Sequence, residues 1–324
     1  MSARIGQYIL ALLVVLLLNF AVPRMMPGDP AQSLTNTELD TPFQLDEETR
    51  GRLLRYHGLD RPLPQQFLAY LGNLARLDLG YAIYYKCDVS ALIAERLPWT
   101  VLLAGVSFAL SALAGVVLGT VAACRQGTRL DRGLVASLLA VRAMPAYLTG
   151  MLAIVLFSAR LKLFPLGGAT APFARYASAW AAAGDILWHL ALPALVLSVA
   201  QTARVFLLMR NSMVLVLGEA YMTTAEAKGL PWRRRVFRYG MRNAILPVYT
   251  RLGMQLGFLV SGTIFIESVF HYPGMGRLAY EAALVHDYPT LQGIFLVTAL
   301  SIIGANLLVD CTYHLVDPRV RSAR

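Results

Sequence analysis

The feature that most constrains this chain is a series of six long apolar runs. Each run approaches the ~20 residues that an α-helix needs to cross the ~30 Å hydrocarbon core of a membrane. Within hydrocarbon, backbone N–H and C=O groups must pair inside the protein, and a helix achieves this within one segment. The sequence therefore predicts an all-α polytopic membrane protein whose six transmembrane helices cover residues 5–22, 99–124, 134–159, 186–209, 248–270 and 291–313.

The composition agrees with a membrane protein. Charged residues make up 15% of the 324 residues and hydrophobic residues 57%, and the mean hydropathy is +0.54. A soluble domain carries about 25% charged residues. The net charge of +10 would also suit nucleic-acid binding, but the arginines gather at the ends of the apolar runs, where membrane topology places them. Nucleic acid is therefore not an expected partner.

The positive charges also predict an orientation. Lysine and arginine residues lie before the first run, between the second and third, between the fourth and fifth, and after the sixth. These segments share one side of the membrane if the chain crosses six times, and the positive-inside rule makes that side cytosolic. Both termini are therefore predicted to be cytosolic. Arg160 and Lys162, at the outer end of the third run, are exceptions that can snorkel outward.

The predicted topology divides the chain into four parts. The first run is longer than the apolar core of about 7–15 residues in a signal peptide, and no A-x-A site follows it, so we expect a retained helix. Residues 45–56 and 65–77 of the external part are predicted to form short amphipathic helices. A second external stretch, residues 161–185, is expected to line or cover the outer mouth. The four parts are an N-terminal transmembrane helix (1–22), a small external subdomain (23–98), a core with five transmembrane helices (99–313) and a cytosolic tail (314–324).

A polar interruption at residues 219–235 separates the fourth and fifth runs. Its small residues Ala225, Ala227 and Gly229 would let a short helix lie close against a groove of another protein. Pro231 ends such a helix. The pattern leaves two alternatives open: a helix that docks on a partner, or an amphipathic loop helix without one.

Three polar residues within the runs are candidates for a pathway or gate. Intramembrane ionisable groups tend to face the bundle interior or water. Glu267 lies near the outer end of the fifth run, so a pathway role and a packing role both remain open. Arg204 lies in the inner part of the fourth run, with Gln201 one turn before it. Arg204 can equally snorkel to the interface.

No sequence motif predicts catalysis or metal binding. The chain has no P-loop, no H-E-x-x-H and no G-x-S-x-G within a run. Its three cysteines and five histidines have no zinc-site spacing, and Cys87 beside Asp88 is too small a set for a metal. The chain is therefore predicted not to be an enzyme and to hold no cofactor of its own, so an ATP-driven role requires a separate subunit.

Several motifs in order along the chain resemble one known family. Residues 224–229 (TAEAKG) and 243–247 (NAILP) resemble the signature loop of permease subunits of ABC importers, in the dipeptide, oligopeptide and nickel group. Thr223 replaces the first glutamate of the general importer pattern, as in the peptide subgroup. Arg142 departs from the family near Pro145. The other motifs are residues 27–30 (PGDP), 57–62 (HGLDRP), 77–80 (LDLG), 93–98 (IAERLP), 272–276 (YPGMG), 286–289 (HDYP) and 317–321 (DPRVR).

The resemblance implies a fold, partners and a site. The fold would be that of a type I importer permease in a bacterial inner membrane. This chain and a homologous permease would form the pathway, two ATPase subunits would bind ATP and Mg²⁺, and an extracytoplasmic binding protein would deliver solute. The coupling helix, at about residues 219–235, would dock on an ATPase. Its expected contact residues are Tyr221, Thr224, Ala225, Glu226, Ala227, Lys228, Gly229 and Pro231.

The same resemblance leaves the solute open. Dipeptides and oligopeptides are the first expectation, and glutathione-like compounds and nickel or other metal chelates are alternatives. Two rival classes are a self-contained secondary transporter or channel and a structural membrane scaffold. A secondary transporter would show inverted repeats or charges at mid-bilayer, and neither is clear in the sequence.

Overall fold

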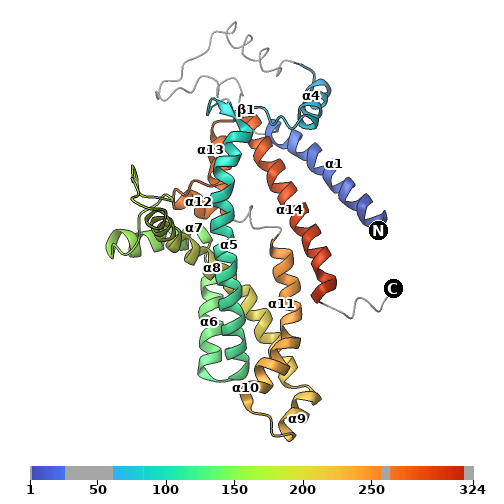
Figure 1. Ribbon diagram of the computed structural model, residues 1–324, viewed down its shortest axis with the longest axis vertical. Coiled ribbons are helices and arrows are strands. Elements are labelled where there is room, and N and C mark those ends of the chain that lie inside the picture. Colours follow the sequence, from blue (N-terminus) through green and yellow to red (C-terminus); the bar gives the residue numbers. More distant parts are fainter. Residues whose placement is uncertain (1, 26–60, 83, 257–262, 317–324) are drawn as a thin grey trace. The chain divides into compact units, whose positions relative to one another are not determined.

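The computed structural model of the protein describes residues 2–25, 61–82, 84–256 and 263–316, and these residues are mostly helical (Figure 1). This agrees with the predicted all-α class. The chain divides into two compact units. Unit 1 comprises Met1–Pro98 and Pro273–Ile303, and unit 2 comprises Trp99–Tyr272 and Gly304–Arg324. The predicted external segment, residues 23–98, is thus part of a larger unit. Residues 45–56, predicted to be helical, lie outside the described residues.

Unit 1 combines helices from both ends of the sequence with a short hairpin. The predicted amphipathic helix at residues 65–77 is confirmed as α4, and Pro64 lies within its first turn, where its missing N–H is not needed. Long helices α5 and α14 contribute residues to both units. The elements are α1 (Ser2–Arg24), α4 (Leu63–Ala75), β1 (Tyr81–Ala82), β2 (Cys87–Asp88), α5 (Val89–Cys124), α13 (Met275–Leu284) and α14 (Tyr288–Val316).

The hairpin of unit 1 is antiparallel and packs into a small apolar core. Tyr81 pairs with Asp88 and Ala82 with Cys87. Ala82 and Val89 are completely buried, in a cluster with residues of α5, α13 and α14. Gly293 lets α14 approach α5 closely, because a Cβ there would lie 2.4 Å from Val89 Cγ1.

The HDYP sequence forms the start of α14. Asp287 Oδ1 accepts the backbone N–H of Thr290 at 3.3 Å, which is N-cap geometry. Asp287 Oδ2 accepts the N–H of Tyr84 at 3.1 Å. One buried carboxylate therefore caps α14 and fixes the hairpin loop. Pro289 lies in the first turn, where a proline is tolerated.

Unit 2 holds the remaining helices. Two apolar clusters form its core: one joins α5, α7, α8 and α12, and the other joins α5, α8, η2 and α11. Four large side chains in these clusters and helices are completely buried: Leu103, Phe206, Met209 and Met213. The elements are α6 (Arg129–Ala143), α7 (Ala146–Ala153), η1 (Ile154–Arg160), α8 (Ala179–Leu217), α9 (Ala220–Ala227), α10 (Trp232–Arg234), η2 (Arg235–Gly240), α11 (Met241–Leu256) and α12 (Ile264–Val269).

Two glycines one turn apart let α5 and α8 pack closely. A Cβ on Gly115 would lie 2.5 Å from Val205 Cβ, and a Cβ on Gly119 would lie 2.8 Å from the Phe206 carbonyl oxygen. Small residues at this spacing are typical of close helix pairs in membranes. Larger residues at either position would force the two helices apart.

Three described helices are long and apolar enough to cross a membrane. They are α5 and α8, which contain the second and fourth predicted runs, and residues 288–307 of α14, which cover the sixth run up to residue 307. The first run lies within α1, whose residues Leu12–Arg24 form a shorter apolar helix. The fifth run falls on α11 and α12, with residues 257–262 outside the described part. Six crossings therefore stay a prediction.

The third predicted run is broken. The helix Arg129–Ala143 and the helical stretch Ala146–Arg160 meet at 100°. Pro145 lacks a backbone N–H and disfavours the helical conformation in the residue before it, and Met144 is extended, with ψ 136°. The sequence prediction of one span over residues 134–159 missed this break.

Candidate functional site

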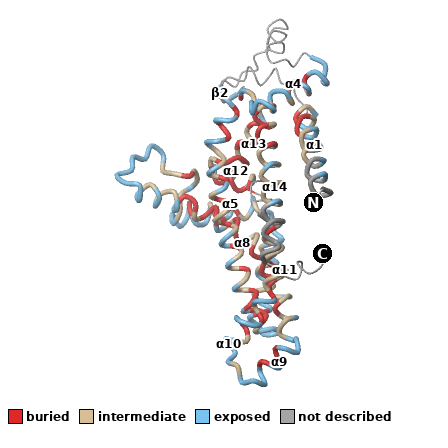
Figure 2. Tube along the Cα trace, turned by 45° about the vertical axis from the view of Figure 1, so that its right-hand side comes forward, coloured by how far each residue is buried: buried red, intermediate tan, exposed pale blue. Residues whose placement is uncertain are grey.

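The loop between α8 and α11 lies at one end of unit 2 and is mostly exposed (Figures 1 and 2). Helix α8 ends at Leu217, and an extended Glu219 starts the eight-residue helix α9. Met222 and Ala225, three residues apart, are each 5% exposed, so they form the inner face of α9. The sequence predicted this short helix correctly, but Ala225 faces inward and is not available as a docking contact.

The other residues predicted for docking lie on the outer surface of the loop. Helix α9 packs on η2, which leaves its opposite face open. Nearby Trp232 is 49% exposed and Phe237 61%. The surface therefore combines small, aromatic and basic side chains. Its exposed members from the predicted set are Tyr221, Thr224, Glu226, Ala227, Lys228, Gly229 and Pro231.

Gly229 fixes the way in which α9 ends. Its φ is +70°, which L-residues with a Cβ rarely adopt. The N–H of Gly229 donates to the Glu226 carbonyl at 2.8 Å, and the N–H of Leu230 donates to the Ala225 carbonyl at 3.2 Å. These two bonds form a Schellman motif. Apart from its chain neighbours, no described residue has an atom within 4 Å of a Cβ placed on Gly229, so bulk at this position would project outward.

Side-chain contacts tie α9 to the segments on either side of it. Glu226 Oε1 and Arg235 Nη1 are 2.7 Å apart. The Arg235 guanidinium lies 5.3 Å from the centre of the Trp232 ring. Asn243 Nδ2 donates to the Tyr221 hydroxyl at 2.9 Å, which joins α9 to α11. The second signature segment (243–247) therefore contacts α9, the helix that contains most of the first.

The inner side of the loop is closely packed. Val236 is 2% exposed and Met213 is completely buried. A Cβ on Gly240 would lie 2.8 Å from Met213 Cε, so η2 rests directly against α8. Because α8, η2 and α11 share one apolar cluster, a displacement of the loop would be passed to two long helices.

Glu267 is completely buried within unit 2. Its Oε1 accepts hydrogen bonds from Thr100 Oγ1 at 2.8 Å and Thr263 Oγ1 at 2.7 Å. Its backbone carbonyl accepts the N–H of Tyr272 at 2.8 Å. These contacts join α12 to α5. In the described residues Glu267 is therefore part of a packed polar contact.

Gln201 and Arg204 have different surroundings. Gln201 Oε1 accepts a hydrogen bond from Gln255 Nε2 at 2.9 Å and a longer one from Ser111 Oγ at 3.4 Å. This polar cluster joins α5, α8 and α11. Arg204 is exposed. The described hydrogen bonds of Gln201 and Glu267 therefore go to different partners, and Arg204 faces outward.

An ion pair that the sequence analysis did not single out lies beside these helices. Arg210 Nε and Nη2 donate to the two oxygens of Asp131 at 2.7 and 2.8 Å. Asp131 also accepts the N–H of Gly127 at 3.0 Å, and Thr128 caps α6 by accepting the N–H of Asp131. The spacing of Thr128 and Asp131, three residues apart, was a usable signal for a helix start. It gave no indication that Asp131 pairs with Arg210.

A second polar network stabilises unit 1. The Tyr85 hydroxyl donates to Glu281 Oε2 at 2.9 Å, and Arg277 Nε donates to Glu281 Oε1 at 2.6 Å. Burial, followed by the bond to Glu281, raises the pKa of Tyr85. Burial also raises the pKa of the Cys87 thiol. Among the described residues, no group of three or more His, Cys, Asp or Glu side chains could hold a metal ion.

Comparison with known proteins identifies the family. Residues 115–322 match the model of the binding-protein-dependent transport system inner membrane component. A protein of Brucella suis biovar 1, provisionally named a peptide permease protein, is 39% identical, with 96% of this chain and 95% of the relative covered. The dipeptide transport system permease protein DppB of Escherichia coli K12 is 34% identical over 98% of this chain and 97% of its own. The glutathione transport system permease protein GsiC of Pectobacterium atrosepticum is 37% identical over 96% and 94%.

Proposed function

The chain belongs to the family of binding-protein-dependent transport system inner membrane components, and we propose that its α9 loop couples ATP hydrolysis by partner subunits to solute transport. It is a multi-pass membrane protein and an ABC importer permease of the peptide group. The observation that carries the proposal is the outer face of α9, which is open to solvent while its inner face packs on η2.

A coupling element must be rigid, because a flexible one would absorb the motion it should transmit. The Schellman motif at Gly229, the Glu226–Arg235 ion pair and the Asn243–Tyr221 hydrogen bond all support a rigid α9. The apolar cluster around Met213 connects the loop to α8 and α11. Closure of an ATPase beneath α9 would therefore move these two helices.

The proposed assembly contains this chain, a homologous permease, two ATPase subunits that bind ATP and Mg²⁺, and an extracytoplasmic binding protein. Six crossings with cytosolic termini would put the α9 loop on the cytosolic side and residues 23–98 outside, where they would contact the binding protein or cap the pathway. ATP and the loaded binding protein would drive alternating access by stabilising the outward-open state. The permease itself would catalyse no reaction and hold no cofactor.

We propose di- and oligopeptides as the solute class. The names of the relatives support this class, because they include a dipeptide permease and the oligopeptide permease AppB of Bacillus subtilis. A glutathione-type solute is the alternative supported by GsiC, and metal chelates are a further one. A screen of the co-purifying binding protein against these solutes would distinguish them.

For the pathway, we propose separate roles for the three polar candidates. The buried Glu267 and its two threonine partners would hold α12 against α5 through the transport cycle. Gln201 would form a polar link that rearranges when α5, α8 and α11 move. Arg204, which is exposed, would contact lipid headgroups or the partner permease.

A pair of substitutions at Gly229 tests the coupling role. Gly229→Asn keeps a residue that tolerates positive φ and adds little bulk, whereas Gly229→Arg adds a long side chain to the open surface. We expect Gly229→Arg to reduce co-purification of the ATPase subunits and ATP-driven uptake at least about tenfold, with membrane insertion unchanged. Gly229→Asn should retain most of both. Normal uptake by a correctly inserted Gly229→Arg protein would contradict the proposal.

Purification from the native membrane in mild detergent tests the assembly. We expect a homologous permease and P-loop ATPases to accompany the chain and to hydrolyse ATP. If the chain came out alone and moved solute in liposomes without ATP, a self-contained secondary transporter or channel would replace the importer. If its deletion left uptake intact while the other subunits remained, a scaffold role would replace it.

A further inference from the structure

Unit 1 contains a cavity that the coupling role does not use. Its volume is about 460 Å³, within the range of about 300–1,000 Å³ for small-molecule sites. The end of α1, helix α4, the turn before β1 and the first turns of α14 surround it. Its lining is mixed, with charged, amide and aromatic side chains, so an apolar occupant would leave polar groups without partners.

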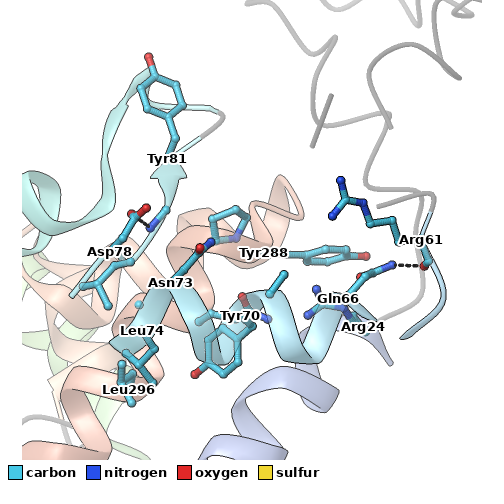
Figure 3. Close-up of a pocket in the computed structure, with 16 residues that line it drawn as sticks. Arg24, Arg61, Gln66, Tyr70, Asn73, Leu74, Asp78, Tyr81, Tyr288 and Leu296 are labelled. Carbon is cyan, nitrogen blue, oxygen red and sulfur yellow. Dashed lines mark hydrogen bonds between the residues drawn. The ribbon is translucent and has the colours of Figure 1, made fainter. Parts of the chain in front are cut away.

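One side of the cavity is cationic: Arg24 and Arg61 lie there, and Gln66 makes hydrogen bonds to both residues. Gln66 Oε1 accepts a hydrogen bond from Arg24 Nε at 3.1 Å, and Gln66 Nε2 donates to the Arg61 carbonyl at 2.8 Å. The Gln66 amide thus contacts the Arg24 side chain and the Arg61 backbone, and Figure 3 shows both arginines on the same side of the cavity. Two guanidinium groups together favour a carboxylate or phosphate.

The Arg24 side chain is fixed in place but keeps donors for a ligand. Its guanidinium lies 3.7 Å from the centre of the Phe20 ring, and Nη1 donates to the Phe20 carbonyl at 3.0 Å. A guanidinium has five N–H donors, and the remaining ones have no partner within the described residues. Arg24 is therefore oriented before any ligand binds, which lowers the entropy cost of binding.

The opposite side of the cavity is anionic. Figure 3 shows Asp78 on the opposite side of the cavity from Arg24, Arg61 and the Tyr288 ring. Asp78 Oδ1 accepts the N–H of Gly80 at 2.8 Å. Its second oxygen has no hydrogen-bond partner in the described parts of the chain and can accept from an ammonium group. Gln292 also lines the cavity, and its Nε2 is buried without a partner among the described residues.

We propose that this cavity binds a small zwitterion, with its anionic group on Arg24 and Arg61 and its ammonium group on Asp78. The charges on the two sides of the cavity match such a ligand. Short peptides and the phosphoethanolamine headgroup of a lipid share this chemistry. The site is independent of the α9 loop and needs no partner subunit.

Binding to the full-length chain, purified in a maltoside detergent, tests the site. Isothermal titration with dialanine would measure the affinity of the wild type and of Arg61→Gln, Asp78→Asn and Arg175→Gln. Arg61 is exposed, and Asn at position 78 keeps the oxygen that accepts from Gly80, so both variants should fold. Arg175 is an exposed arginine of unit 2 and is the matched control for loss of one positive charge.

Modified ligands assign each charge to its side. We expect Arg61→Gln and Asp78→Asn each to weaken dialanine binding by about tenfold or more, as for loss of a charge-assisted hydrogen bond. N-acetyl-dialanine has no ammonium group, so its affinity should fall in Arg61→Gln and stay unchanged in Asp78→Asn. Dialanine amide has no carboxylate, so its affinity should fall in Asp78→Asn and stay unchanged in Arg61→Gln. Arg175→Gln should bind like the wild type.

Free phosphoethanolamine distinguishes the two sources of a zwitterionic ligand, a short peptide and a lipid headgroup. Binding of dialanine without competition by phosphoethanolamine supports a solute site, and binding of phosphoethanolamine alone supports a lipid-headgroup site. Each result supports the zwitterion site if Arg61→Gln and Asp78→Asn weaken binding of the compound concerned. The proposal is overturned if neither compound binds the wild type. It is also overturned if both variants bind the compound with the same affinity as the wild type. Neither of these results bears on the Gly229 experiments.

Discussion

At the scale of single residues, the Asp131–Arg210 ion pair links α6 to α8. The Asp131 side chain is 3% exposed and that of Arg210 is 21% exposed. We predict that Asp131→Asn lowers the free energy of unfolding by about 3 kcal/mol, because a partly buried guanidinium loses its charged partner. Denaturant unfolding in detergent would measure this. Glu95→Gln is the control, since Glu95 is 68% exposed and its oxygen is 3.8 Å from Arg96.

The double variant Asp131→Asn/Arg210→Gln separates the contribution of the ion pair to stability from the separate contributions of its two residues. If the pair interacts directly, the double variant should be less destabilised than the sum of the two single variants, because no unpaired charge remains. Additive effects of the two substitutions would show that the ion pair contributes nothing of its own.

Tyr85 gives unit 1 an alkaline pH dependence. The pKa of Tyr85 is raised in the folded protein from its ordinary value of 10.0, so below that pH both states are protonated and stability does not change. Above pH 10.0 the unfolded chain loses its proton first, and stability falls by up to about 1.4 kcal/mol per pH unit. Thermal unfolding of wild type and Tyr85→Phe between about pH 8 and 11 should show the extra fall only in the wild type. Parallel curves for the two proteins would exclude the effect.

At the scale of elements, the break between α6 and α7 decides the path of the third apolar run. Without Pro145, nothing in the local sequence would prevent a continuous helix. We predict that Pro145→Ala increases the population of a straight helix, in which residues 139 and 152 would lie about 20 Å apart. Spin labels at Leu139→Cys and Leu152→Cys, on a background without native cysteines, would measure the distance. Pro231→Ala should leave it unchanged, and an unchanged distance in Pro145→Ala would assign the bend to tertiary packing.

At the scale of the whole molecule, six crossings can be tested by labelling from one side. We predict that a membrane-impermeant maleimide labels Arg61→Cys in right-side-out vesicles and labels Lys228→Cys only after permeabilisation, on a background without native cysteines. Both positions are exposed, so access depends on the membrane alone. Labelling of both residues from outside would require a different number of crossings between α4 and α9.

Part of the candidate site could be predicted from the sequence. The short helix at residues 220–227 follows from its small residues between Glu219 and Pro231, which are local signals. The inward direction of Ala225 does not follow from them, because the inner face of an eight-residue helix depends on what packs beneath it. The contacts of Glu267 with Thr100 and of Asp131 with Arg210 were also not predictable, since their partners are 167 and 79 residues away.

The sequence alone determined the membrane-embedded helical class, the family and the position of the α9 loop. Hydropathy, charge distribution and local motifs act over a few turns of chain, and a helix in hydrocarbon must pair its own backbone. The tertiary structure decided which face of α9 points outward, the pairing of Asp131 with Arg210 and the cavity lined by Arg24 and Asp78. These depend on packing between segments far apart in the chain, where the position of each side chain is set by neighbours that no local pattern specifies.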